Sequence, residues 1–96
     1  MSKLVRDKIP EIIKRNGEHP KYYIAENIEY YEKLKQKLPE EVDEFLEDSN
    51  EEELIDILEV INAIIEFKEI NKERLEFLRQ KKAEEKGRFK ERIILD

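Results

Sequence analysis

The sequence predicts an all-α fold, a bundle of four to five helices with short extended segments near residues 21–24 and 90–95. Apolar residues recur at steps of three and four along the chain, the spacing of one helix face. Hydrophobic residues make up 39% of the chain, which opposes disorder although 46% of the residues are charged. The two extended segments could pair with each other. The length of 96 residues favours a single domain, residues 1–96.

Composition excludes several classes of protein. The chain has no Cys, which excludes a disulfide scaffold and any Cys-based zinc site. A net charge of −6 argues against a nucleic-acid partner, because that function needs a basic face. No apolar run is long enough to span a membrane, and the first residues lack the apolar stretch of a signal peptide. We therefore expect a cytoplasmic protein with no membrane partner.

The first half of the chain predicts two or three helices. The first runs from about residue 7 to 16 and can be capped by Asp7. The next runs over about residues 25–37. Pro39 removes a backbone donor, so we expect a kink there or a fresh helix over residues 39–47.

The second half predicts two further helices with clear end signals. Ser49 and Glu52 fit a capping box for a helix over about residues 50–68, which is the most hydrophobic segment. Asn71 is a plausible cap for a last helix over residues 72–86. A glycine at position 87 follows and should end it.

Two hexapeptides share one pattern of acidic and apolar residues. Residues 41–46 and 53–58 both read acid, apolar, any residue, acid, apolar, apolar. Acids three residues apart are neighbours on one helix face, and here they flank the apolar stripe. The four acids are Glu41, Glu44, Glu53 and Asp56.

The short turn between these segments predicts an antiparallel helix pair. Residues that lie level in such a hairpin have numbers with a constant sum. Glu44 should therefore lie level with Glu53, and Glu41 level with Asp56. These two rungs of carboxylates would be separated by one helical turn, ~5 Å.

Four carboxylates so close together repel one another unless a cation neutralises them. An all-oxygen site favours Mg²⁺, with Mn²⁺ as a substitute, and protein-bound Mg²⁺ commonly contacts substrate phosphates. The chain has 25 acidic residues, however, so such pairs also arise by chance. Glu29 and Glu32 have the same spacing, and the alternative interpretation is a solvated acidic face.

The acid pairs also resemble a known signature. Glu41-x-x-Glu44 followed by Glu53-x-x-Asp56 resembles the ExxE…ExxD motif of the all-α NTP pyrophosphohydrolase, or MazG-like, superfamily. The chain is also similar near both ends to the phosphoribosyl-ATP pyrophosphohydrolase-like branch of that superfamily. The segments concerned are KLVRDKIP at residues 3–10 and KKAEEKGRF at residues 81–89.

This resemblance implies a reaction and roles for individual residues. Members hydrolyse a nucleotide between the α and β phosphates, and they commonly form dimers or larger oligomers. It implies catalytic roles for Glu41 and Glu44, which could activate water, although a neighbour such as Glu40 could do so instead. The implied ligands of Mg²⁺ are Glu41, Glu44, Glu53 and Asp56. The candidates for phosphate binding are Arg6, Lys8, Lys82 and Lys86.

Two hypotheses follow from the sequence. The first is a Mg²⁺-dependent nucleotide pyrophosphohydrolase, acting as a homodimer or higher homo-oligomer on a nucleotide whose base the sequence does not specify. Clearing of non-standard nucleotides would fit this activity. The second is a non-catalytic helical oligomer that binds a partner, in which the acids form a solvated face. A thermal shift that depends on Mg²⁺ and nucleotide separates the two, because a ligand of the native state raises its stability.

Overall fold

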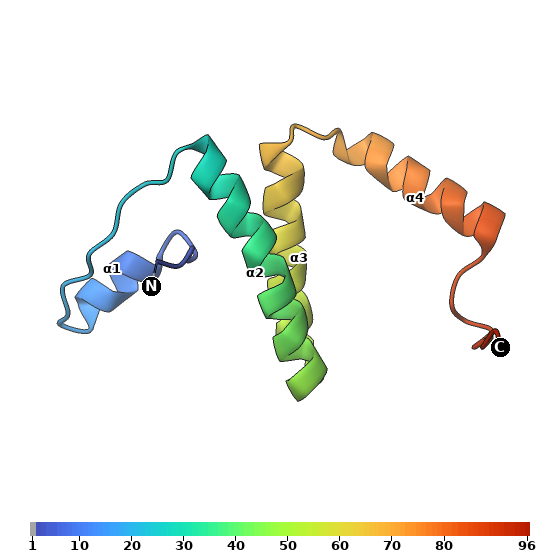
Figure 1. Cartoon of the computed structure of the whole chain (residues 1–96), viewed down its shortest axis with the longest axis horizontal. Coiled ribbons are helices and arrows are strands. Elements are labelled where there is room, and N and C mark those ends of the chain that lie inside the picture. Colours follow the sequence, from blue (N-terminus) through green and yellow to red (C-terminus); the bar gives the residue numbers. More distant parts are fainter. Residues whose placement is uncertain (1) are drawn as a thin grey trace. The chain divides into compact units, whose positions relative to one another are not determined.

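The computed structural model describes residues 2–96, and within this range it contains four α-helices and no strand, as the sequence predicts for an all-α fold. None of the helices among the described residues could span a lipid bilayer. The chain divides into two compact units, residues 2–64 and residues 65–96. The helices in Figure 1 are α1 Ile9–Arg15, α2 Asn27–Asp48, α3 Glu51–Phe67 and α4 Lys72–Lys86.

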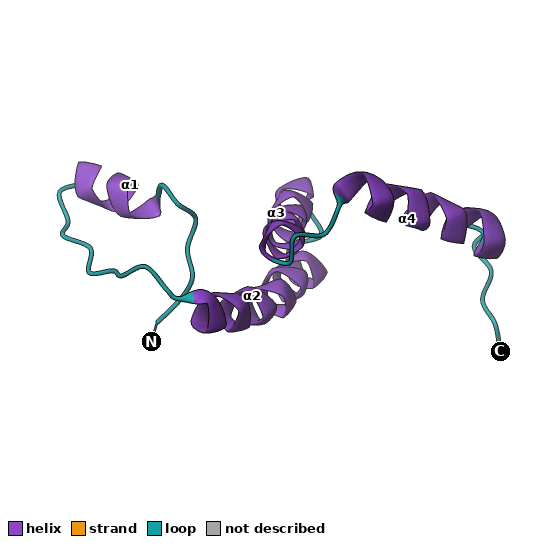
Figure 2. Cartoon of the chain, turned by 90° about the horizontal axis from the view of Figure 1, so that it is seen from above, coloured by secondary structure: helices purple, strands orange, loops and turns teal. Residues whose placement is uncertain are grey.

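The first unit is built on an antiparallel pair of helices, α2 and α3, which lie side by side in both views (Figures 1 and 2). Apolar burial in this hairpin is small. Leu34 on α2 is 3% exposed and Val60 on α3 is 7% exposed. Other large aliphatic side chains of α3, including Leu58 at 64%, remain open to water. The hairpin therefore has a narrow core between its two helices.

The helix that follows the hairpin turn, α3, is capped by a different residue from the one predicted. Ser49 has φ of 54° and its N–H donates to the carbonyl of Phe45 at 2.7 Å, so it ends α2. A residue in this left-handed conformation cannot also take the extended conformation of an N-cap. The Asn50 side chain caps α3 instead, because its Oδ1 accepts the N–H of Glu53 at 3.1 Å. The predicted capping box of Ser49 and Glu52 is therefore wrong.

Pro39 does not start a new helix, because α2 continues through it from Asn27 to Asp48. Pro39 and Lys35 are both exposed, so water can hydrate the Lys35 carbonyl that lacks its usual helical donor.

The start of α1 also differs from the prediction. Asp7 is not its N-cap. Lys8 occupies that position without a side-chain hydrogen bond.

The second unit contains α4, whose two ends agree with the prediction. Asn71 Oδ1 accepts the N–H of Arg74 at 2.8 Å. Gly87 ends the helix at φ of 85°, and its N–H donates to the Ala83 carbonyl at 2.8 Å. The segments over residues 21–24 and 90–95 form neither helix nor strand within their own units, and their pairing with each other stays a prediction.

Candidate metal centre

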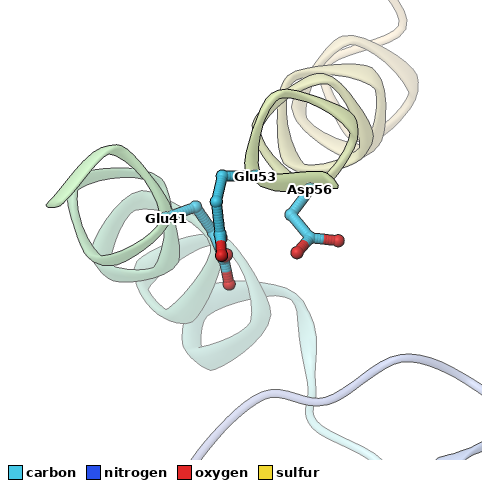
Figure 3. A group of neighbouring side chains, drawn as sticks. All are labelled: Glu41, Glu53 and Asp56. Atoms are coloured by element: carbon cyan, nitrogen blue, oxygen red, sulfur yellow. The ribbon is translucent and has the colours of Figure 1, made fainter. Parts of the chain in front are cut away.

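Three carboxylates of the α2–α3 hairpin gather at one place. Glu41, Glu53 and Asp56 each offer a carboxylate oxygen, and these oxygens all lie within 4.8 Å of one another. Figure 3 shows Glu41 coming from α2, and Glu53 and Asp56 from α3. Glu41 is 8% exposed, and the other two residues are half-buried. We refer to these three residues as the acidic cluster.

The register of the hairpin brings the acidic cluster together. Glu53 and Asp56 are three residues apart on α3, so they share one face of that helix. The predicted fourth ligand, Glu44, lies outside the cluster and is exposed. It is nevertheless close enough to Glu53 to repel its charge. The structure thus groups three of the four predicted acids and leaves the fourth beside Glu53.

Two cations partly neutralise the acidic cluster. Lys37 Nζ lies 3.4 Å from Glu41 Oε1, one turn away on α2. Arg6 Nη2 donates to Asp56 Oδ1 at 2.7 Å, across 50 positions of the sequence. Sequence reasoning named Arg6 as a phosphate ligand and did not consider Lys37. The spacing of four residues between Lys37 and Glu41 is the signal that could have found this ion pair.

Glu53 is the member of the cluster without a cationic partner among the described interactions. Its Oε2 atom is buried and makes no hydrogen bond within the described residues. The pKa of Glu53 is raised from 4.5 to about 7. The largest cause is the loss of water around its carboxyl, followed by the neighbouring negative charges of Glu44 and then of Asp48. Sequence reasoning missed the part of Asp48, which belongs to the last turn of α2. A carboxylate in this state gains from a bound cation.

The donor set fits a hard divalent cation. The donor atoms that it offers are all carboxylate oxygens, and no Cys or His belongs to the cluster. Oxygen-only sites of this kind favour Mg²⁺, Mn²⁺ or Ca²⁺ over Zn²⁺. The unpaired, buried Oε2 of Glu53 supplies an observation of its own, because an orphaned carboxylate oxygen is costly unless a proton or a cation satisfies it.

The remaining predicted phosphate ligands lie in other parts of the chain. Lys8 is exposed at the start of α1. Lys82 and Lys86 are exposed on α4 and belong to the second unit. A role for these three lysines at the acidic cluster stays a prediction.

Comparison with family models, with curated proteins and with solved structures finds no match to this chain. The likeness to the MazG-like superfamily therefore rests on the motifs of the sequence.

Proposed function

We propose that this chain is a Mg²⁺-dependent nucleotide pyrophosphohydrolase of the MazG-like type, located in the cytoplasm. It would convert a nucleotide and water into a monophosphate and pyrophosphate, by cutting between the α and β phosphates. The observation that carries the proposal is the acidic cluster, whose oxygens lie within 4.8 Å of one another across two helices. Removal of non-standard nucleotides is a use that fits this activity.

In this proposal Glu41, Glu53 and Asp56 hold the ion, and Glu44 completes the set from its place beside Glu53. The bound ion would shield phosphate charge and make water more acidic. Glu41 and Glu44 have different surroundings. Glu41 is buried and paired with Lys37, which suits a fixed ligand. Glu44 is exposed, so its carboxylate can meet an incoming water and accept a proton from it.

A triphosphate brings about four negative charges to a site that is already acidic, so cationic side chains must assist the ion. Arg6 is already at the acidic cluster through its ion pair with Asp56. Lys8 follows it by two residues in the same segment. We assign the same role to Lys82 and Lys86 of the second unit, on the strength of the motif that contains them.

The proposal includes a homodimer or higher homo-oligomer. Leu54, Leu58 and Ile61 on α3 are 45%, 64% and 39% exposed, and their spacing of four and three residues is that of a helix-packing seam. We name these residues the α3 stripe. A second copy of the chain offers a matching stripe of equal length. The stripe also supports the second candidate function, a non-catalytic helical oligomer, which requires no metal.

The test is release of pyrophosphate from a broad panel of nucleotides, with Mg²⁺ and with a chelator. Activity should require Mg²⁺ and should fall by at least about 100-fold in Asp56→Asn, because loss of even an outer-sphere partner costs about 10–100-fold. Asp43→Asn is the matched control, since Asp43 is exposed on α2 and outside the cluster. Equal activity of the two variants, or no release from any nucleotide together with no Mg²⁺ effect on melting, would favour the non-catalytic oligomer.

A further inference from the structure

The N-terminal segment contacts the α2–α3 hairpin at two points, one of which is the acidic cluster. Arg6 Nη2 donates to Asp56 Oδ1 at 2.7 Å, and Lys33 Nζ donates to the carbonyl of Ser2 at 3.1 Å. Residues 2–6 form neither helix nor strand, and Figure 3 shows the N-terminal trace passing close to the cluster. This irregular segment therefore carries a cation to the carboxylates from outside the hairpin.

The two cations at the acidic cluster differ in how they are held. Lys37 sits on α2 one turn from Glu41, and its side chain is 19% exposed. Arg6 comes from the irregular segment, and its side chain is 52% exposed. Exposed ion pairs contribute little free energy because water and salt screen them. The contact between Arg6 and Asp56 can therefore be exchanged at small cost, whereas Lys37 is part of the helix that bears its partner.

We infer that Arg6 is an exchangeable counter-ion of the proposed metal site. It neutralises Asp56 while the site lacks a divalent cation, and it passes to the phosphates of the substrate once the cation has taken over that carboxylate. This inference rests on the proposed function. A bound Mg²⁺ repels the guanidinium, while a polyphosphate attracts it and matches its planar fork of donors.

The backbone geometry suits such an exchange. The Arg6 carbonyl accepts the N–H of Ile9 at 3.1 Å, which ties the Arg6 backbone to the start of α1. The side chain can then turn from Asp56 to a phosphate near the cluster without moving the chain around it. One arginine would thus lower the cost of the empty site and raise the affinity for the charged substrate.

The experiment measures two ligands separately by isothermal titration calorimetry, Mn²⁺ alone and then inorganic tripolyphosphate in the presence of Mg²⁺. Arg6→Gln should bind Mn²⁺ more tightly, by up to about fivefold, because the metal no longer competes with the guanidinium. The same variant should bind tripolyphosphate at least about tenfold more weakly, because charge-assisted hydrogen bonds are lost. Opposite changes in the two affinities are the signature of exchange.

Two further variants act as controls. Lys3→Gln removes the same charge from an exposed position of the same segment, and it should leave the Mn²⁺ affinity unchanged. Arg6→Lys keeps the charge but loses the planar fork, so it should resemble the wild type toward Mn²⁺ and fall between the two toward tripolyphosphate.

The outcomes separate this inference from the proposed function. If the wild type binds no Mn²⁺ or Mg²⁺, both fail. If it binds the metal but Arg6→Gln weakens that binding or leaves it unchanged, Arg6 merely orients Asp56, and the exchange is overturned while the metal site stands. An unchanged affinity for tripolyphosphate in Arg6→Gln also overturns the exchange, because the guanidinium then has no second partner.

Discussion

The two sides of α3 have opposite chemistry within a single helix. One side carries Glu53 and Asp56, which join Glu41 in the acidic cluster. The α3 stripe lies on the other side, because Leu54 and Leu58 are each two residues from Asp56 and thus about 160° away around the helix. Packing against α2 partly buries the acidic side, whereas the side chains of the α3 stripe remain exposed to water.

The two sides of α3 differ in what the α2–α3 hairpin fails to supply to them. Packing against α2 half-buries Glu53 and Asp56 of the acidic cluster. Among the described interactions, Arg6 pairs with Asp56 and Lys37 pairs with Glu41, whereas Oε2 of Glu53 remains unpaired. The stripe has the opposite deficiency, because its apolar side chains are left exposed by the packing of α3 against α2 within the first unit. The proposed cation would neutralise the acidic side of α3, and the proposed second copy of the chain would bury its apolar side. Each could bind without the other.

The largest expected effect is on metal affinity and compares two adjacent acids of α3. Glu53→Gln should weaken Mn²⁺ binding by at least about 100-fold, because it removes a proposed ligand from the acidic cluster. Glu52→Gln has the same change of charge at an exposed position and should bind as the wild type does. Titration calorimetry measures both. Equal losses in the two variants would mean that the affinity depends on net charge and needs no specific site.

The next largest effect is on self-association and concerns the α3 stripe. Leu58→Glu should raise the dissociation constant of the proposed homodimer by more than about tenfold, because it places a charge in an apolar seam. Phe77→Glu on α4 is a close control, since Phe77 is 66% exposed and Leu58 is 64% exposed. Sedimentation equilibrium measures the association, and circular dichroism checks the helix content. A wild-type chain that stays monomeric at high concentration contradicts the oligomer proposal.

The sequence predicted the fold best where one residue alone determines the end of a helix. Asn71 caps α4 and Gly87 ends it, as predicted, because both positions depend on local backbone chemistry. Prediction failed for the capping box at Ser49 and for the fresh helix at Pro39, where the neighbouring elements decide, while the alternative of a kink at Pro39 stays a prediction. The left-handed Ser49 closes α2 and leaves the cap of α3 to Asn50. Pro39 is tolerated inside α2, at a position exposed to water.

The candidate site was predictable in part, for a similar reason. The repeated acid pairs and the constant sum of an antiparallel hairpin were enough to expect acids on facing helices. They could not tell that Glu44 would stay exposed beside the cluster while Glu41 became buried. Nor could they place Arg6 against Asp56, because a contact across 50 positions depends on the path of the irregular N-terminal segment.

A smaller effect concerns the pH dependence of stability without divalent ions. The native pKa of Glu53 is about 7, above its ordinary value of 4.5, so the native state binds the proton more tightly than the unfolded state. The free energy of unfolding should therefore fall as the pH rises from 4.5 to 7, and the loss should be complete above pH 7.

Glu53→Gln tests this pH dependence, because it removes the titrating group. The variant should melt at a higher temperature than the wild type at pH 8 in a chelator, and the gap should narrow near pH 5. Saturating Mg²⁺ should also narrow it, by stabilising only the wild type. Thermal melts followed by circular dichroism give the comparison, with Glu52→Gln as the control. A gap that is constant across pH would assign the effect to packing and not to ionisation.

The smallest effect compares two identical caps that differ in their distance from the chemistry. Asn50 Oδ1 accepts the N–H of Glu53, a residue of the acidic cluster, whereas Asn71 Oδ1 accepts the N–H of Arg74 on α4. Substitution of either residue by Ala should cost about 1 kcal/mol of stability. Only Asn50→Ala should also weaken Mn²⁺ binding, by a few-fold, because it loosens the turn that positions Glu53. If Asn71→Ala weakens the metal equally, the affinity follows global stability, and the first turn of α3 has no special part in shaping the site.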